Sequence, residues 1–430
     1  MQKTPLRFLR KNKEFLSTIS YQITLLIGSL LLLKLLAYVL SLQNYGYYSL
    51  ITSILALIFV FPFGVFLQGV GRYVSVYDNK NQSREFFTII LVLFVIAVIF
   101  VATIALLLHN VLSFKKTWHM LYLYVLFLAI SEIFKSLFSA INNAKRQRNN
   151  LFIASIIEYT AKLSLIYGSY LYIDTAIEKI ILALIISNVL AICIMISKNL
   201  SLFTIDAFAY QKAKIIIVRI WLFSYPLLIW AFFTWLRDMS NRWYLDYFWD
   251  KEKVALFTML ASIALIMPTA LQSLIGSFFL PILYQNHNTN KNFINTFSTI
   301  VLPTIFILLC IASVFVYVFK HEIILLIADS KYLELSWMLP WMFIIYSFYI
   351  ISTLASYELF VHKATKKLII SSTLPGVISI TFGYYLIKVN GLEGALYNYA
   401  ITYLSFSVLT FYAVLKHRRG INDKKNLPKN

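Results

Sequence analysis

Long, nearly uncharged apolar segments run through this sequence from one end to the other. A helix needs about 20 mostly apolar residues to cross a membrane, and twelve segments meet that requirement. They lack the alternating pattern of outer-membrane barrel strands. We therefore expect an all-α polytopic membrane protein with transmembrane helices near residues 16–41, 47–71, 86–108, 119–143, 151–173, 178–197, 219–245, 254–283, 294–319, 333–360, 367–387 and 391–415.

The low content of charged residues supports the same fold class. Only 13% of the 430 residues are charged, and 60% are hydrophobic. A soluble domain carries about 25% charged residues, so most soluble enzyme classes are excluded. The basic segment before the first apolar run resembles the start of a signal peptide. However, the run is too long and no cleavage site stands out, so we expect a retained helix.

The positions of lysine and arginine predict the orientation of the chain. With twelve helices both termini lie on one side, and placing them in the cytoplasm leaves 25 of the 38 basic residues on the inside. Only 8 then lie in outer loops, as the positive-inside rule requires. The net charge of +20 therefore reports orientation, and we expect no nucleic-acid partner.

Nothing in the sequence indicates a metal or another cofactor. Cys193 and Cys310 lie far apart within apolar segments, and the six histidines show no metal-ligand or catalytic-triad spacing. The longest polar loop, near 198–218, has about 20 residues, so we expect no extramembrane domain. The function is expected to lie within the bilayer.

A weak internal repeat divides the sequence into two halves. Tyr45–Leu50 matches Val254–Met259, and each segment opens an apolar helix with a proline near its middle. Further matches follow at nearly constant offsets, namely Pro62 with Pro268, Gly69 with Gly276, Tyr77 with Tyr284, and Gly168–Leu171 with Gly383–Leu386. We expect an N-terminal six-helix lobe at 1–204 and a C-terminal six-helix lobe at 205–430. A pseudo-twofold axis along the membrane normal would relate them, with a cleft between them.

Nine ionisable residues fall inside the apolar segments, where each charge costs about 2.5–3.5 kcal/mol on insertion scales. Three pairs have the spacing of neighbours on one helix face. In these pairs, mutual neutralisation is the alternative to a functional role. The nine residues are Lys34, Glu132, Lys135, Glu158, Lys162, Arg237, Asp238, Arg242 and Glu358, and the pairs are Glu132–Lys135, Glu158–Lys162 and Asp238–Arg242.

Lys34 has no acidic residue near it in the sequence, and the repeat offset matches it with Arg242. If the two helices line a cleft, two cations at equal depth would repel each other unless an anion lay between them. We infer an anionic ligand. The alternative is that Lys34, Arg237 and Arg242 extend to the membrane interface.

Several stretches resemble bacterial polysaccharide flippases. Leu40–Leu50 (LSLQNYGYYSL) resembles the segment that joins the first two helices of that family, and Phe63-Gly64 and Arg72 fit the helix that follows. Asn241–Phe248 (NRWYLDYF) is similar to the family's Asp-Arg-x-x-Leu-Gly-Tyr-Phe, and the next helix ends in a matching FLPIL at 279–283. The chain departs from the pattern at Asn241 and Asp246, and Asp238 is the candidate replacement for the lost acid.

The resemblance is to O-antigen or capsule flippases of the Wzx type, in the superfamily of multidrug extruders and the lipid II flippase. It implies a V-shaped, two-lobed bundle in the bacterial inner membrane. It implies a substrate of undecaprenyl-diphosphate-linked oligosaccharide, moved to the outer leaflet by alternating access, with membrane lipids and polysaccharide polymerase as further partners. Candidate substrate-binding residues are Lys34, Arg242, Arg72, Arg237, Lys135 and Lys162, with Arg148 and Arg219 as weaker candidates.

Two other functions remain open from the sequence. An organic-cation antiporter of the same superfamily needs unpaired acids, and Glu358 and Asp238 are the candidates for coupling to a proton or sodium ion. A polysaccharide polymerase or ligase resembles chains with one long outer loop, whereas no outer loop here exceeds about 17 residues. We therefore expect a transporter and no enzymatic activity.

Overall fold

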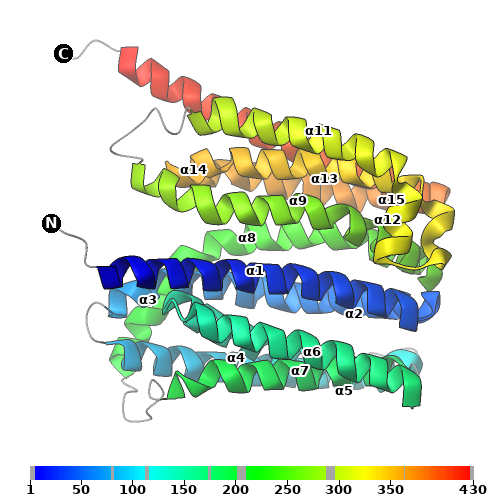
Figure 1. Cartoon of the computed structure of the whole chain (residues 1–430), viewed down its shortest axis with the longest axis horizontal. Helices are drawn as coiled ribbons and strands as arrows, with labels where there is room; N and C mark the ends of the chain where they lie inside the picture. The colour runs from blue at the N-terminus through cyan, green and yellow to red at the C-terminus, as the bar shows by residue number, and fades with distance from the viewer. Residues whose placement is uncertain are drawn as a thin grey trace. The chain divides into compact units, whose positions relative to one another are not determined.

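The computed structural model describes residues 5–78, 82–111, 116–172, 176–200, 210–286, 296–362 and 364–426. These residues form helices and connecting turns, with no strand among them (Figure 1). Nine of the helices are long and apolar enough to cross a membrane, and a helix pair bent by 46° at 225–227 within α8 adds a tenth if the pair is one span. The chain is a multi-pass membrane protein, and the expected all-α fold class is confirmed.

The first half of the chain contains α1 (Pro5–Val39) and α2 (Leu42–Ile58), then a π-helical turn η1 (Phe59–Gly64) that leads into α3 (Val65–Asp78). The π turn includes Pro62, which has no N–H to donate to the α-helical ladder. The next helices are α4 (Ser83–Val111), α5 (Lys116–Ala144), α6 (Arg148–Tyr172) and α7 (Ile177–Ser197).

The second half begins with α8 (Tyr210–Phe248) and α9 (Lys251–Asn286), and the π turn η4 (Phe297–Val301) leads into α11 (Leu302–Val318). The short helix α12 (Lys320–Ile327) and the 3₁₀ turn η5 (Ser330–Leu335) were not predicted. After α13 (Met338–Ala355) come the short α14 (Tyr357–Val361), the 3₁₀ turn η6 (Thr365–Leu368) and α15 (Ile369–Asn426).

Helix α15 covers two of the expected spans. The apolar stretch Lys366–Arg419, which includes the end of η6 and most of α15, has 54 residues and would be about 80 Å long if straight, against a hydrocarbon core of about 30 Å. The backbone breaks at Gly391, where φ is +57°, and Gly394 lies close against the carbonyl group of Leu386. Glycine accepts both the positive φ and the close approach because it has no side chain. The two predicted segments at 367–387 and 391–415 are thus two arms of α15.

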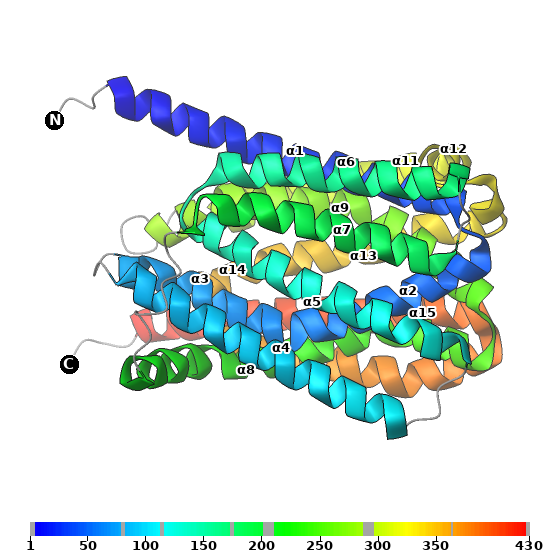
Figure 2. The same ribbon diagram turned by 90° about the horizontal axis from the view of Figure 1, so that it is seen from below.

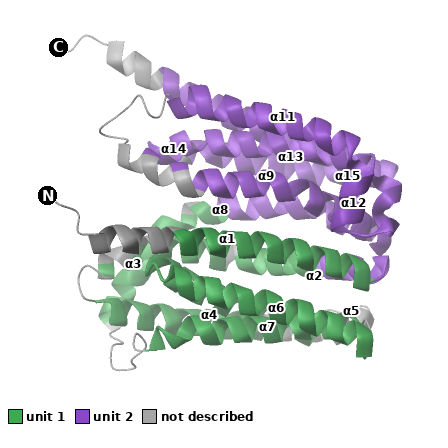
Figure 3. Ribbon diagram, viewed as in Figure 1, with its two compact units in different colours: residues 1–40, 51–228 green, residues 41–50, 229–430 purple. Residues whose placement is uncertain are grey.

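The chain forms two compact units, coloured separately in Figure 3. One unit comprises 1–40 and 51–228, and the other comprises 41–50 and 229–430. The boundary predicted from the sequence, between residues 204 and 205, lies outside the described residues.

In the first unit, α1 packs along α6, α6 packs along α7, and α7 packs along α5 (Figure 2). Its apolar core is formed mainly by α3, α4 and α5, with buried aromatic side chains such as Phe86, Phe87 and Phe94. The helices α5, α6 and α7 are therefore held side by side, which brings their polar residues together. In the second unit, α13 is central and packs against α9, α11 and α15.

Candidate functional site

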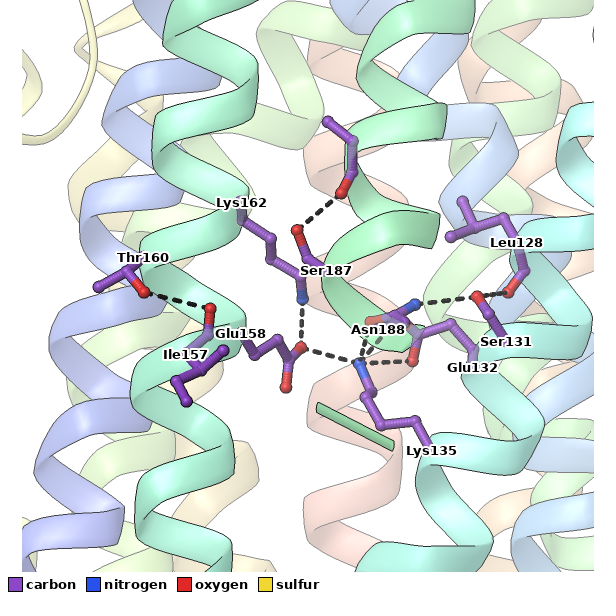
Figure 4. Close-up of polar contacts among 11 residues, drawn as sticks. Leu128, Ser131, Glu132, Lys135, Ile157, Glu158, Thr160, Lys162, Ser187 and Asn188 are labelled. Carbon is purple, nitrogen blue, oxygen red and sulfur yellow. Dashed lines mark hydrogen bonds and ion pairs between the residues drawn. The ribbon is translucent and has the colours of Figure 1, made fainter. Parts of the chain in front are cut away.

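Five polar and charged side chains from α5, α6 and α7 meet inside the first unit (Figure 4). We call Glu132, Lys135, Glu158, Lys162 and Asn188 the α5–α7 cluster. Residues three or four apart lie on the same face of a helix, so Glu132 and Lys135 share one face of α5, and Glu158 and Lys162 share one face of α6. Packing of the three helices then brings those faces together.

Lys135 is at the centre of the cluster. Its Nζ atom lies 2.9 Å from Oε2 of Glu132 and 3.0 Å from Oε1 of Glu158. It also donates to Oδ1 of Asn188 at 2.9 Å. A lysine ammonium has three hydrogens, so these acceptors use its full donor capacity.

The other members complete the charge balance. Lys162 donates to the same Glu158 oxygen, and Asn188 donates to Glu132 at 3.0 Å and to Ser131 at 3.1 Å. Two carboxylates face two ammonium groups, so the α5–α7 cluster has no net charge when all four groups are ionised. Such mutual pairing lowers the cost of placing charges within a membrane. Glu132 has the most accessible side chain of the four, at 30% exposure.

The sequence predicted the two same-helix pairs of this cluster, Glu132–Lys135 and Glu158–Lys162, and the structure shows both. It did not predict the bond from Lys135 to Glu158, because spacing along one helix carries no information about its neighbours. Asn188 was also missed. The available signal was the pair Ser187-Asn188, two polar residues in the otherwise apolar stretch 180–196.

In the second unit, Arg237 is 1% exposed and pairs with the residue next to it. Its Nε atom lies 2.7 Å from Oδ1 of Asp238, and Tyr403 donates to the same oxygen at 2.7 Å. The guanidinium carbon lies 4.7 Å from the ring centres of Tyr349 and Tyr403, and 4.9 Å from that of Phe406. The cation is therefore held in an aromatic enclosure as well as by an ion pair.

These contacts correct two expectations. Asp238 was expected to pair with Arg242, one turn away, but it pairs with Arg237 because the buried guanidinium bends back to its neighbour. Arg237 was also considered a residue that extends to the interface, whereas it is buried. Arg242 is half-buried and donates to the backbone carbonyl oxygen of Ser49 at 3.1 Å.

Glu358 was selected as an acid without a base one turn away, and its partner comes from a distant part of the sequence. Nε and Nη2 of Arg418 lie 2.9 Å and 2.6 Å from Oε2 of Glu358, and Ser298 donates to the same oxygen at 3.4 Å. Glu358 lies on α14 and Arg418 near the end of α15. The expectation of an unpaired acid is therefore wrong, because tertiary packing supplies an arginine.

Lys34 is exposed near the end of α1, and it makes no ion pair with any acid in the described part of the structure. The predicted approach of Lys34 and Arg242 stays a prediction, since one belongs to each unit. Arg72 lies in α3, and its side chain is outside the described part of the structure. Arg148 donates to Asn143, and Arg219 donates to the hydroxyl of Tyr77 at 3.3 Å.

The described residues hold no group of three or more His, Cys, Asp or Glu side chains that could bind a metal ion. Cys193 and Cys310 are both exposed and unbonded. What the charged groups can do chemically is therefore to exchange protons, to bind ions, or to hold helices together.

Comparison with known proteins gives similarity in structure only. The sequence matches no protein-family model and no curated protein. Among solved structures, an inward-facing multidrug resistance MATE family transporter of the MOP superfamily superposes with a TM-score of 0.69 at 15% identity, covering 93% of this chain and 96% of that one.

Two further structures extend this finding. The Vibrio cholerae MATE transporter VcmN, in its bent form, gives a TM-score of 0.60 at 16% identity, covering 94% of this chain and 97% of that one. The lipid II flippase MurJ, in its inward closed conformation, gives 0.63 at 18% identity, covering 93% and 87%. The chain thus has the fold that MATE transporters of the MOP superfamily share with the lipid II flippase.

Proposed function

We propose that this chain is a flippase for undecaprenyl-diphosphate-linked oligosaccharide, of the kind that supplies O-antigen or capsule synthesis. It would act in the bacterial inner membrane with both termini in the cytoplasm, and would move its substrate to the outer leaflet by alternating access. A diphosphate carrying sugars cannot cross the hydrocarbon core unaided, because charged and polar groups lose their hydration there. The protein must therefore offer cations to the head group.

The observation that carries this proposal is the state of the charges within the membrane segments. Each of the four acids described there is in an ion pair, and these acids are Glu132, Glu158, Asp238 and Glu358. Lys34, in contrast, is exposed and has no acidic partner among the described residues. A surface with a surplus cation favours an anionic substrate over an organic cation. Arg242, which the repeat offset matches with Lys34, stays the second phosphate contact predicted from the sequence.

The other predicted binding residues fit less directly. Lys135, Lys162 and Arg237 are already bound to carboxylates, so contact with a phosphate would require those pairs to open. The ion-coupling residues Asp238 and Glu358 are likewise held by arginine. For Glu358 we propose that a bound proton would weaken its bidentate pair with Arg418, and so release the end of α15 from α14.

A cation-coupled drug antiporter is the second candidate. The observation that favours it is the 30% exposure of the Glu132 side chain, which leaves one acid of the α5–α7 cluster accessible. The two functions differ in what is moved, so a transport measurement separates them.

The test in cells is deletion of the gene, followed by complementation with the natural chain or with K34Q. The flippase proposal predicts that deletion leaves lipid-linked oligosaccharide in the cytoplasmic leaflet and that the natural chain restores surface polysaccharide. K34Q should restore it poorly. Normal surface polysaccharide after deletion, in a strain without a second flippase, would contradict the proposal. Increased sensitivity to cationic dyes with normal polysaccharide would support the antiporter.

A further inference from the structure

The exposed face of α1 changes character along its length. Ile23, Ile27 and Leu31 follow one another at single-turn spacing and are 49%, 50% and 49% exposed. The same stripe then continues with Lys34 and Tyr38, which is 56% exposed. An apolar strip thus ends in a cation and then an aromatic ring.

Helix α6 lies beside α1 and runs in the same direction. A Cβ atom at Gly28 would overlap the ring of Tyr159, and the ring centres of Tyr38 and Tyr170 lie 5.6 Å apart. These contacts join residues separated by 131 and 132 positions in the sequence, so the two helices keep one register between them. Lys34 therefore lies at the level of residues 165–166 of α6.

At that level α6 exposes polar and aromatic side chains. Ser164 is exposed, Tyr167 is 48% exposed and Tyr170 is 38% exposed. The rings of Tyr167 and Tyr170 lie 6.3 Å apart and are inclined by 32°. The two tyrosines of α6 and Tyr38 of α1 thus form a continuous aromatic surface next to the cation.

We propose that this face of α1 and α6 is a binding site for an isoprenoid diphosphate sugar. The isoprenoid lies along Ile23, Ile27 and Leu31, and the diphosphate contacts Lys34. The first sugar lies on the rings of Tyr38, Tyr167 and Tyr170. The inference rests on the proposed function and assigns the order in which the parts of its substrate contact the protein.

The strip has room for the first isoprene units of this occupant, and the chemistry of the face agrees with its head group. From Ile23 to Lys34 is 11 residues, or about 16 Å of helix, which is about half of the hydrocarbon core and therefore the depth of one leaflet. The ammonium of Lys34 supplies the charge that a diphosphate requires. Tyrosine rings offer apolar faces to the C–H groups of a sugar and hydroxyls to its oxygens. A phospholipid would bring a single phosphate charge to the lysine, whereas a diphosphate brings more than one, and the phospholipid has no sugar ring to lie on the three tyrosines.

The test is native mass spectrometry of the full chain, released from detergent, with three lipid probes. The probes are undecaprenyl diphosphate, undecaprenyl diphosphate carrying N-acetylglucosamine, and phosphatidylglycerol. The variants are K34Q and Y38L. The matched control is K416Q with Y412L, because Lys416 and Tyr412 are also an exposed lysine and tyrosine one turn apart, on α15.

We expect K34Q to weaken binding of both diphosphates about tenfold and phosphatidylglycerol much less. Y38L should weaken only the sugar-bearing probe, by about fivefold. Equal losses for all three probes would mean a general lipid site and would overturn the inference. No loss in either variant would mean that Lys34 only extends to the membrane interface. If neither variant loses binding but the natural chain still translocates the lipid, the proposed binding site is wrong and the proposed function is not contradicted.

Discussion

Nζ of Lys135 lies 3.0 Å from Oε1 of Glu158, an acid on a different helix. Lys135 also pairs with Glu132 on its own helix and donates to Asn188 on α7, so this one base joins α5 to both α6 and α7. Substitution of Lys135 by methionine would keep the side-chain volume and leave two acids, Glu132 and Glu158, facing one base, Lys162. The α5–α7 cluster is therefore expected to be as important for stability as for transport.

We expect K135M to destabilise the protein by about 3–5 kcal/mol, the range for removing one partner of a buried ion pair. Thermal unfolding in detergent measures the change. The double variant K135M/E132Q leaves one acid, Glu158, opposite one base, Lys162, and should recover much of the loss. A double variant no more stable than K135M would show that charge balance is not what holds the cluster.

The enclosure of Arg237 predicts that lysine cannot replace arginine there. R237K keeps the charge, but it loses the planar group that contacts three rings and the Nε hydrogen bond to Asp238. We expect a loss of about 1–2 kcal/mol in thermal unfolding. Unchanged stability of R237K would mean that the positive charge alone is required.

The turn at Gly391 predicts a loss of stability on substitution. A residue with a Cβ atom in this sparsely populated backbone conformation costs about 1–3 kcal/mol, so G391A should lower the unfolding temperature. Gly168 in α6 is the matched control, because a Cβ atom there meets nothing within 4 Å. G168A should be neutral or slightly stabilising. Equal losses in the two variants would rule out the backbone explanation.

The pair of Glu358 with Arg418 gives a test of ion coupling. E358Q mimics the protonated acid and removes the bidentate ion pair, so transport by this variant should no longer respond to a pH gradient. The measurement is the rate of substrate movement in vesicles with and without that gradient, and K416Q serves as the control. A response in E358Q equal to that of the natural chain would exclude Glu358 as the coupling residue.

The sequence was sufficient to predict the fold class, because twelve apolar segments of spanning length leave few alternatives. Each of these segments is mainly helical where the structure describes it. The single-turn pairs Glu132–Lys135 and Glu158–Lys162 were equally predictable, since they follow from helix geometry alone. The hydroxyls of Ser49 and Thr258, which the internal repeat matches, lie 2.8 Å apart.

Contacts between distant helices could not be predicted in this way. Arg418 reaches Glu358 across 60 residues, and Asn188 reaches Lys135 across 53. Neither pairing leaves a signal in local spacing. Asp238 pairs with Arg237 and not with Arg242. This pairing depends on the burial of the Arg237 guanidinium against Tyr349, Tyr403 and Phe406, which only tertiary packing determines.

The most direct test of the proposed function is movement of a labelled lipid by the purified chain in proteoliposomes. The substrate is undecaprenyl diphosphate carrying a fluorescent N-acetylglucosamine, and a membrane-impermeant reagent irreversibly destroys the fluorescence of every molecule that reaches the outer leaflet. The natural chain should make nearly all of the label accessible, K34Q should slow this about tenfold, and K416Q should not. If the natural chain leaves half of the label protected, as protein-free vesicles do, while it moves ethidium across the same membrane, the flippase account is contradicted.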